Sequence, residues 1–214
     1  RVRIPLLPPL LIKLVFLKCL MQNFNLFNLI KSLKNIENIK VITKKILVRL
    51  FGIKNKIDDT QHLEFLKNNS LNYDSFFSKI NTNLWNETKL ISRTINEHSK
   101  NILDNIRYDL GGGGSVETVY FLTRLTKPIN IIETGVAAGF TSYAFLEAIK
   151  KNKIGNLYSS DFPYFRIKEP EKFIGVVIPE QLKKNWNLYI KGDEYNINEI
   201  QKKIKSVDLI HYDS

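Results

Sequence analysis

Four short apolar segments in the second half of the chain have the pattern of β-strands, and helical patterns separate them. They are INIIET from residue 129, NLYSSD from 156, WNLYIKGD from 186 and VDLIHYD from 207. Strands that alternate with helix-length segments predict a parallel sheet with helices on its faces. The expected fold class is therefore α/β, with a Rossmann-like, doubly wound parallel sheet over residues 111–214.

A carboxylate stands at the end of each predicted strand: Glu133, Asp161, Asp193 and Asp213. Ligands of doubly wound sheets bind at the carboxyl ends of the strands. One such residue alone could be a helix cap or a solvated turn residue. Four in corresponding positions predict a ligand site at that edge of the sheet.

The first predicted strand runs into a glycine turn, and its sequence discriminates between three nucleotide-type ligands. The lysine and spacing of a P-loop are absent. A dinucleotide turn needs three glycines, but the chain has only Gly135, with Ala137 and Phe140 at the other two places. Glu133 would also repel a pyrophosphate. S-adenosylmethionine has no phosphate, is cationic at its sulfonium and ammonium, and carries a ribose diol that a carboxylate such as Asp161 can accept, so it suits the turn better.

The run GGGGS at residues 111–115 could pass for an engineered linker. However, Ser115 is a good N-cap for the helical pattern that follows, and Pro128 ends that pattern before the next strand. We therefore expect a native loop whose missing side chains let the backbone approach another part of the protein closely.

Taken together, these blocks resemble the class I S-adenosylmethionine-dependent methyltransferases, and within them the subgroup called methyltransferase domain 24. The resemblance covers about residues 110–214, from GGGGSVETVYFLTRL to VDLIHYDS. It implies a cofactor site made of Glu133, Gly135, Ala137, Gly139, Asp161 and Asp193. Asp161 would take the ribose hydroxyls and Asp193 would lie near the adenine. Many members have a glycine where this chain has Ala137, and a small residue should suffice there.

Two residues at the end of the fourth predicted strand are candidates for acting on the methyl acceptor. A hydroxyl acceptor must lose its proton, and strand alternation puts His211 and Asp213 on one face. Asp213 could instead be a ligand of a divalent metal such as Mg²⁺. The structural alternative is a core-facing His211 and a helix-capping Asp213. By family analogy, the predicted reaction is O-methylation of a sugar or other small-molecule hydroxyl.

The formal net charge of +11 raises two other functions. An RNA methyltransferase would use lysines as phosphate contacts, but no stretch of interleaved aromatic and basic residues supports a nucleic-acid partner. A non-catalytic membrane-surface or scaffold module would use residues 24–51, where lysines flank apolar residues at helical spacing and could contact anionic lipid. The lysines are scattered among many Asn and Ile residues, as AT-rich codons would produce, so a designed basic face is the weaker explanation.

We expect three regions along the chain. Residues 1–20 precede Met21, the only methionine, and their lysines and prolines break any signal or membrane span. Because Arg1 to Pro5 match codons that resemble the T-arm of a transfer-RNA gene, we expect upstream translation or a disordered leader there. Residues 21–110 should form a helical N-terminal region, and residues 111–214 the cofactor domain.

Two further expectations concern the whole protein. The single cysteine, Cys19, fits a reducing compartment and hence the cytoplasm. The class I domain has seven strands where this sequence shows four, so we expect a C-terminally truncated domain whose fourth strand presents an open edge.

Overall fold

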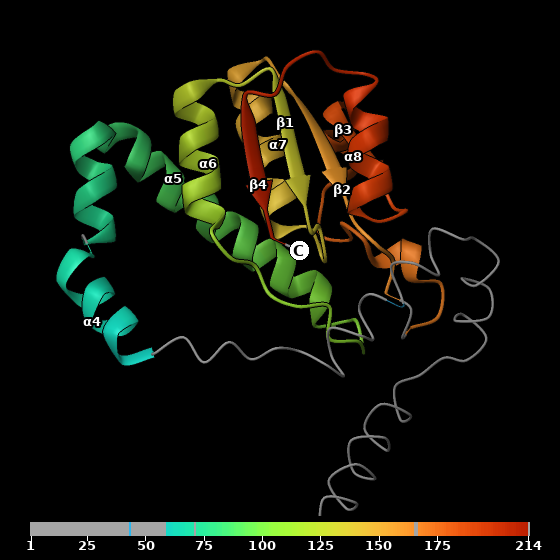
Figure 1. The fold of residues 1–214 in the computed structure, drawn as a ribbon, viewed down its shortest axis with the longest axis horizontal. Helices are drawn as coiled ribbons and strands as arrows, with labels where there is room; N and C mark the ends of the chain where they lie inside the picture. Colours follow the sequence, from blue (N-terminus) through green and yellow to red (C-terminus); the bar gives the residue numbers. More distant parts are fainter. Residues whose placement is uncertain (1–42, 44–58, 71, 165–166, 214) are drawn as a thin grey trace, which may run out of the picture.

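The computed structural model describes Thr43 and residues 59–70, 72–164 and 167–213 (Figure 1). The predictions for residues 1–20 and, Thr43 apart, for residues 24–51 lie outside these residues. Within the described part of the chain, no helix has both the length and the apolar character needed to span a membrane.

A parallel sheet of four strands in the order β3-β2-β1-β4 forms the centre of the fold. The strands are β1 (Asn130–Thr134), β2 (Asn156–Ser160), β3 (Trp186–Tyr189) and β4 (Leu209–Tyr212). All four predicted strands are confirmed. The chain advances from β1 to β3 in one direction and then crosses back, so a topological switch point lies between β1 and β4.

Helices cover both faces of the sheet (Figure 1). On one face, α7 (Phe140–Asn152) connects β1 to β2 and packs with α6 (Val116–Thr126) and α5 (Tyr73–Leu103). On the other, α8 (Asp193–Gln201) connects β3 to β4. Since crossovers between parallel strands are right-handed, reversing the direction of advance moves the connecting helix to the opposite face. The prediction of a doubly wound α/β sheet is confirmed.

The remaining elements are short or peripheral. Two 3-10 helices, η1 (Pro170–Phe173) and η2 (Glu180–Asn185), lie between β2 and β3, and α4 (Asp59–Asn69) precedes α5. The edge strand β4 alternates between half-buried and exposed residues, with Ile210 64% and Tyr212 73% exposed.

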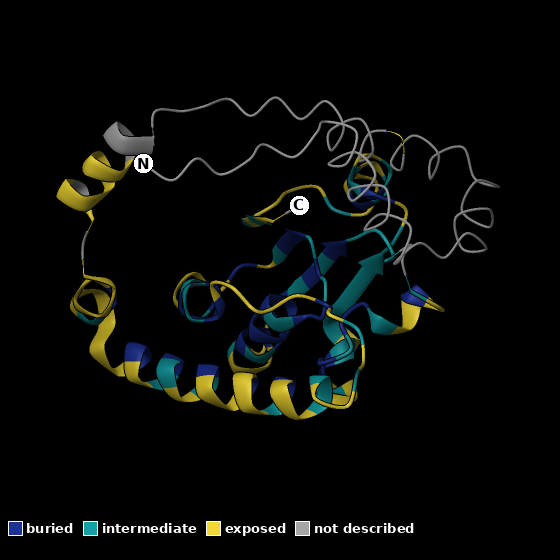
Figure 2. Ribbon diagram, turned by 90° about the horizontal axis from the view of Figure 1, so that it is seen from below, coloured by how far each residue is buried: buried dark blue, intermediate teal, exposed yellow. Residues whose placement is uncertain are grey.

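The helix α5 is amphipathic and carries an aromatic cluster. Buried and exposed residues alternate along it (Figure 2), as a helix that packs on one side requires. The rings of Phe77 and Trp85 stack 4.8 Å apart, and Phe121 of α6 meets both edge-on. Phe77 and Trp85 are buried, whereas the neighbouring Phe76 is 43% exposed.

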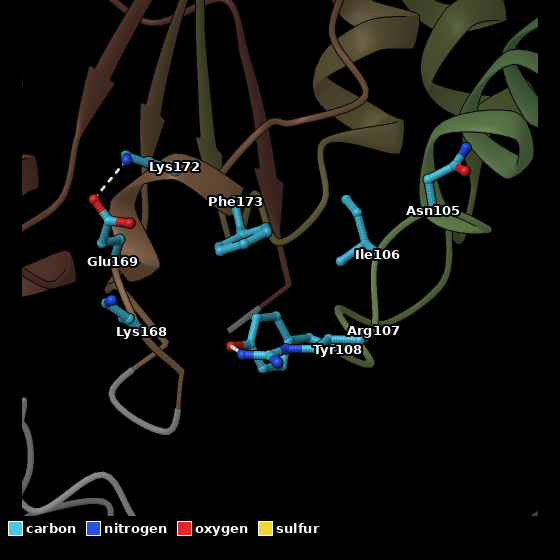
Figure 3. Close-up of a pocket in the computed structure, with 8 residues that line it drawn as sticks. All are labelled: Asn105, Ile106, Arg107, Tyr108, Lys168, Glu169, Lys172 and Phe173. Atoms are coloured by element: carbon cyan, nitrogen blue, oxygen red, sulfur yellow. Dashed lines mark hydrogen bonds and ion pairs between the residues drawn. The ribbon is translucent and has the colours of Figure 1, made fainter.

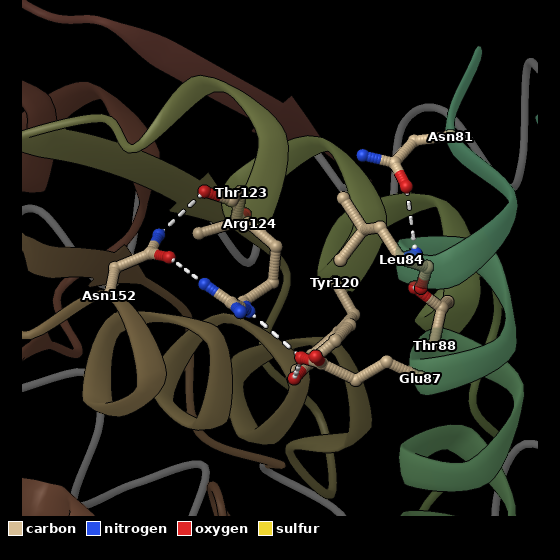
Figure 4. Close-up of polar contacts among 8 residues, drawn as sticks. All are labelled: Asn81, Leu84, Glu87, Thr88, Tyr120, Thr123, Arg124 and Asn152. Carbon is tan, nitrogen blue, oxygen red and sulfur yellow. Dashed lines mark hydrogen bonds and ion pairs between the residues drawn. The ribbon is translucent and has the colours of Figure 1, made fainter.

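A polar network joins α5 to α6 and α7 (Figure 4). Glu87 of α5 accepts hydrogen bonds from the Tyr120 hydroxyl (2.6 Å) and from Arg124 Nε (2.9 Å), both in α6. Arg124 also donates to Asn152 at the end of α7, whose amide donates to the Thr123 carbonyl (2.8 Å). The arginine therefore holds three helices together, and its hydrogen bond lowers the pKa of Glu87.

The boundaries of α6 test the expected capping. The helix ends at Thr126, before Pro128, as predicted. Ser115 stands at the N-cap position, but its side chain makes no capping hydrogen bond, so that part of the prediction is wrong. Capping serines usually have an extended backbone, whereas Ser115 is left-handed with φ 56°.

We expect Glu87→Gln to lower the free energy of unfolding at neutral pH by about 1–2 kcal/mol, because a charge-assisted bond to Arg124 is lost. The lowered pKa of Glu87 means that its contribution is fully present above the ordinary value of 4.5 and is lost as the pH falls through the folded value. Urea unfolding followed by tryptophan fluorescence should show the deficit shrinking in acid. Glu97→Gln, an exposed site on the same helix, is the control and should change little.

Candidate functional site

The glycine turn after β1 has a left-handed backbone at three positions: Gly135 (φ 79°), Ala137 (φ 51°) and Gly139 (φ 102°). A side chain at residue 139 would also meet Gly175, since an added Cβ would lie 2.7 Å from its Cα. Glycine is therefore required at position 139 by both conformation and contact. Ala137 is the one residue of the three that keeps a Cβ in an uncommon conformation.

Asp161 lies directly against this turn. Its Oδ2 atom accepts hydrogen bonds from the backbone N–H groups of Val136 (3.0 Å) and Ala137 (2.7 Å). The Gly135 N–H donates in turn to the Ser160 carbonyl at the end of β2 (2.9 Å). The structure thus brings the predicted turn and the predicted β2 carboxylate together at the carboxyl edge of the sheet.

Glu133 is held differently, because its side chain is fully buried. Its carboxylate accepts hydrogen bonds from three hydroxyls: Thr141 (2.7 Å) and Ser142 (2.6 Å) at the start of α7, and Ser159 in β2 (2.7 Å). Burial raises its pKa, and the hydroxyls oppose that rise. All these contacts are internal, so Glu133 holds the start of α7 to the sheet. Its part in a cofactor motif stays a prediction.

The same hydroxyl network reaches β3. Ser159 Oγ also accepts a hydrogen bond from the indole Nε1 of Trp186 (2.8 Å). The Trp186 ring packs against Gly175, where an added Cβ would collide with it. The Glu133 carboxylate in β1 thus connects β2 and the first turn of α7 directly, and it connects β3 through Ser159.

Adjacent residues of a strand point to opposite faces of the sheet, so Ser160 points away from the side of β2 that carries Ser159. On that opposite side, Ser160 contacts α8. The Ser160 hydroxyl donates to Asp193, the first residue of α8 (2.6 Å). The amide of the buried Asn196 donates to Ser160 Oγ (2.9 Å) and to the carbonyls of Tyr189 (2.9 Å) and Asp161 (3.2 Å). Asn196 therefore ties the carboxyl ends of β2 and β3 together.

Sequence reasoning missed Asn196, and it also missed the hydroxyl partners of Glu133. The strand β3 ends at Tyr189, so Asp193 lies beyond it, as the first residue of α8. One signal could have found the asparagine: it follows Asp193 by less than one helical turn.

His211 lies in β4 in register with Glu133 of β1. Its half-buried ring meets the Phe145 ring of α7 edge-on at 5.9 Å, and burial lowers its pKa more than nearby Asp213 raises it. The Nδ1 atom is buried and makes no hydrogen bond to any described residue. The contact with Phe145 agrees with a core-facing histidine, while the lowered pKa keeps the ring neutral and able to accept a proton.

Asp213 follows β4 and is exposed. Its backbone N–H donates to the carbonyl (3.2 Å) and hydroxyl (3.3 Å) of Thr134, which places it beside the end of β1. Among the residues that the structure describes, no group of three or more acidic, histidine or cysteine side chains could hold a metal ion. Asp213 as a metal ligand stays a prediction.

The glycine run at residues 111–114 contacts the start of α7, directly after the glycine turn. An added Cβ at Gly113 would lie 2.5 Å from the ring of Phe140, the first residue of α7, whereas Gly112 and Gly114 have open space. The Tyr164 hydroxyl donates to the Leu110 carbonyl just before the run (2.9 Å). The expected close approach is confirmed at Gly113.

Glu133→Gln separates the charge of this residue from its shape. A raised folded pKa means that the contribution to stability is fully present below the ordinary value of 4.5 and is lost as the pH rises through the folded value. Relative to the non-titrating Gln variant, the native chain should therefore lose stability as the pH is raised above 4.5. Urea unfolding at several pH values measures this, and an equal dependence of the free energy of unfolding on pH in both proteins would contradict it.

Glu133→Leu leaves three hydroxyls without an acceptor and should lower the free energy of unfolding by about 3 kcal/mol or more at every pH.

Gly113→Ala should lower the free energy of unfolding by about 1–3 kcal/mol, because the new methyl group overlaps Phe140. Gly112→Ala is the matched control, since nothing lies within 4 Å of its added Cβ. Thermal unfolding of the two variants measures the difference. Equal stability of both would mean that the loop does not rest on α7.

No model of a known protein family and no curated protein matches the chain. Fifteen solved protein chains match it in structure. One is a protein from Klebsiella pneumoniae proposed to be an O-methyltransferase, with 14% identity, a TM-score of 0.39, and coverage of 58% of this chain and 53% of that one. Another is the Podospora anserina methyltransferase PaMTH1 bound to S-adenosylhomocysteine, with 16% identity, a TM-score of 0.36, and coverage of 75% of this chain and 58% of that one. A third is the O-methyltransferase TomG from Streptomyces achromogenes, involved in tomaymycin synthesis and solved with S-adenosylmethionine, with 14% identity, a TM-score of 0.39, and coverage of 57% of this chain and 52% of that one. The chain thus spans little more than half the length of these structures. Similarity at this level concerns the fold alone and assigns no subgroup.

Proposed function

We propose that this protein is an S-adenosylmethionine-dependent methyltransferase that acts on a hydroxyl group of a sugar or another small molecule. The observation that carries the proposal is the Asp161 carboxylate, which stands at the carboxyl end of β2 and touches the glycine turn after β1. In a doubly wound sheet, a ligand placed at this edge meets both features at once.

The chemistry of the site suits this cofactor. The Asp161 carboxylate accepts the N–H groups of Val136 and Ala137 through Oδ2 and that of Phe162 through Oδ1. A carboxylate has about four lone-pair positions, so the proposal has Asp161 hold the turn and accept a ribose hydroxyl with the same group. Asp193, fixed by Ser160 at the start of α8, is the second carboxylate at this edge. Acidic surroundings favour a cationic ligand over a pyrophosphate. When bound, the cofactor supplies the methyl group.

The other residues have distinct parts in the proposal. Glu133 is a positioning residue, because it fixes the first turn of α7 without any exposed surface. Methyl transfer gains most from holding donor and acceptor in near-attack geometry, which a rigid turn provides. His211, kept neutral by its lowered pKa, and the exposed Asp213 are proposed as acceptors of the hydroxyl proton.

Some finer points belong to the same proposal. Asp213 could alternatively be one ligand of a divalent cation such as Mg²⁺. The subgroup called methyltransferase domain 24 and a cytoplasmic location are proposed on the sequence grounds given above.

Binding of S-adenosylhomocysteine to the full chain tests the proposal by calorimetric titration. We expect a dissociation constant of roughly micromolar size, and Asp161→Asn should weaken binding about tenfold or more because charge-assisted hydrogen bonds to the ribose are lost.

Asp208→Asn is the matched control for this experiment. Asp208 Oδ2 likewise accepts hydrogen bonds from two consecutive backbone N–H groups, those of Ile129 (2.8 Å) and Asn130 (2.9 Å), but at the amino end of β1. This variant loses a similar structural contact and should keep its affinity. A folded native chain that binds neither S-adenosylhomocysteine nor S-adenosylmethionine would refute the proposal.

A further inference from the structure

A cavity of about 300 Å³ lies outside the turn and the strand-end carboxylates (Figure 3). One wall comes from the segment after α5, and the other from the loop around η1, after β2. Its lining residues are Asn105, Ile106, Arg107, Tyr108, Lys168, Glu169, Lys172 and Phe173. The volume is at the lower end of the range for small-molecule sites.

Each wall of the cavity is followed along the chain by a segment that contacts the glycine turn or the start of α7. Phe173 lies two residues before Gly175, whose N–H donates to the Ala137 carbonyl (2.9 Å). The segment that contains Tyr108 continues into the glycine run, where Gly113 rests on Phe140 at the start of α7. The walls of the cavity are therefore continuous along the chain with the two segments that border the proposed cofactor site.

Aromatic side chains give the cavity part of its apolar lining. The rings of Tyr108 and Phe173, one from each wall, meet edge-on at 5.4 Å. Both side chains are half-buried, and Ile106 adds further apolar surface. A planar ring is the ligand group that such surfaces accommodate best.

The charged side chains add a positive rim. Arg107 lies over the Tyr108 ring, 4.9 Å from its centroid, and donates a hydrogen bond to the Tyr108 hydroxyl (2.7 Å). That contact orients the guanidinium and leaves its other N–H groups without a partner among the described residues. Lys168 likewise forms no ion pair within the described part of the chain, while Lys172 pairs with Glu169 (2.5 Å). The cavity lining therefore contains three cationic side chains and a single carboxylate, that of Glu169. This excess of positive charge favours an anionic ligand.

We propose that this cavity binds the methyl acceptor, and that the acceptor is a small hydroxylated molecule with a planar ring and a carboxylate or phosphate group. The proposal rests on the methyltransferase function above. Arg107 would bind the anionic group, and Phe173 with Tyr108 would hold the ring beside the glycine turn.

The test is calorimetric titration of the full chain, with saturating S-adenosylhomocysteine, using three probes. These are 4-hydroxybenzoate, the uncharged 4-hydroxybenzamide and inorganic phosphate. We expect 4-hydroxybenzoate to bind roughly tenfold more tightly than the amide, because one charge-assisted pair distinguishes them, and to weaken as salt is added. It should also bind more tightly than phosphate, which offers no ring to stack.

Three variants locate the binding. Arg107→Gln should remove the preference for the charged probe, and Phe173→Leu should weaken both ring-containing probes alike. Lys205→Gln removes the same charge at an exposed lysine that lies before β4 and does not line the cavity, and it should leave all titrations unchanged. Arg107 is exposed, so its variant should fold as the native chain does.

Each outcome decides between the ideas. Equal affinity for the charged and uncharged probes, no binding of any probe, or equal behaviour of Arg107→Gln and Lys205→Gln would overturn the cavity proposal even when S-adenosylhomocysteine binds. Failure of S-adenosylhomocysteine to bind, with the probe pattern intact, would reject the methyltransferase function and leave an anion site. A short oligouridylate that binds more tightly than 4-hydroxybenzoate and loses affinity in Arg107→Gln would replace the small molecule with RNA.

Discussion

One buried carboxylate, that of Glu133, organises the centre of this protein. An isolated charge in the interior is strongly unfavourable, so it needs hydrogen-bond donors close by. Three hydroxyls supply them, and they come from the helix α7, which follows β1, and from the neighbouring strand β2. Glu133 therefore ties both ends of the turn between β1 and α7, and the left-handed residues of the turn add their own contacts, such as the N–H groups of Gly135 and Ala137 that donate to Ser160 and Asp161.

The carboxylates at the ends of β1 and β2, those of Glu133 and Asp161, have different surroundings and different roles. Glu133 points into the interior and has no exposed surface. Asp161 instead contacts the backbone of the turn, at a position that a ligand can reach. A fixed interior acid beneath and an accessible acid beside the turn give a preorganised surface, which a cofactor could bind with little rearrangement.

The sequence predicted the parts of the fold that depend on local pattern. The doubly wound parallel sheet and the edge that carries the carboxylates follow from the spacing of the apolar segments and their intervening helices. It did not reveal contacts between distant residues of ambiguous type: Ser159 and Asn196 look like ordinary polar residues until β2 meets its neighbours. The capping role expected of Ser115 failed because its backbone is left-handed, whereas capping serines usually have an extended backbone. Likewise, the cavity combines Tyr108 with Phe173, which no local pattern connects.

The strand β1 is held at both ends in the same way. Asp208 accepts two consecutive N–H groups where the strand begins, and Asp161 accepts two in the turn that follows it. Strand ends normally fray and exchange their amide hydrogens through small local openings. Because a carboxylate accepts these N–H groups at each end, we expect the amides to exchange only when the surrounding sheet opens as well. The turn is then expected to unfold in the same cooperative unit as the core strand.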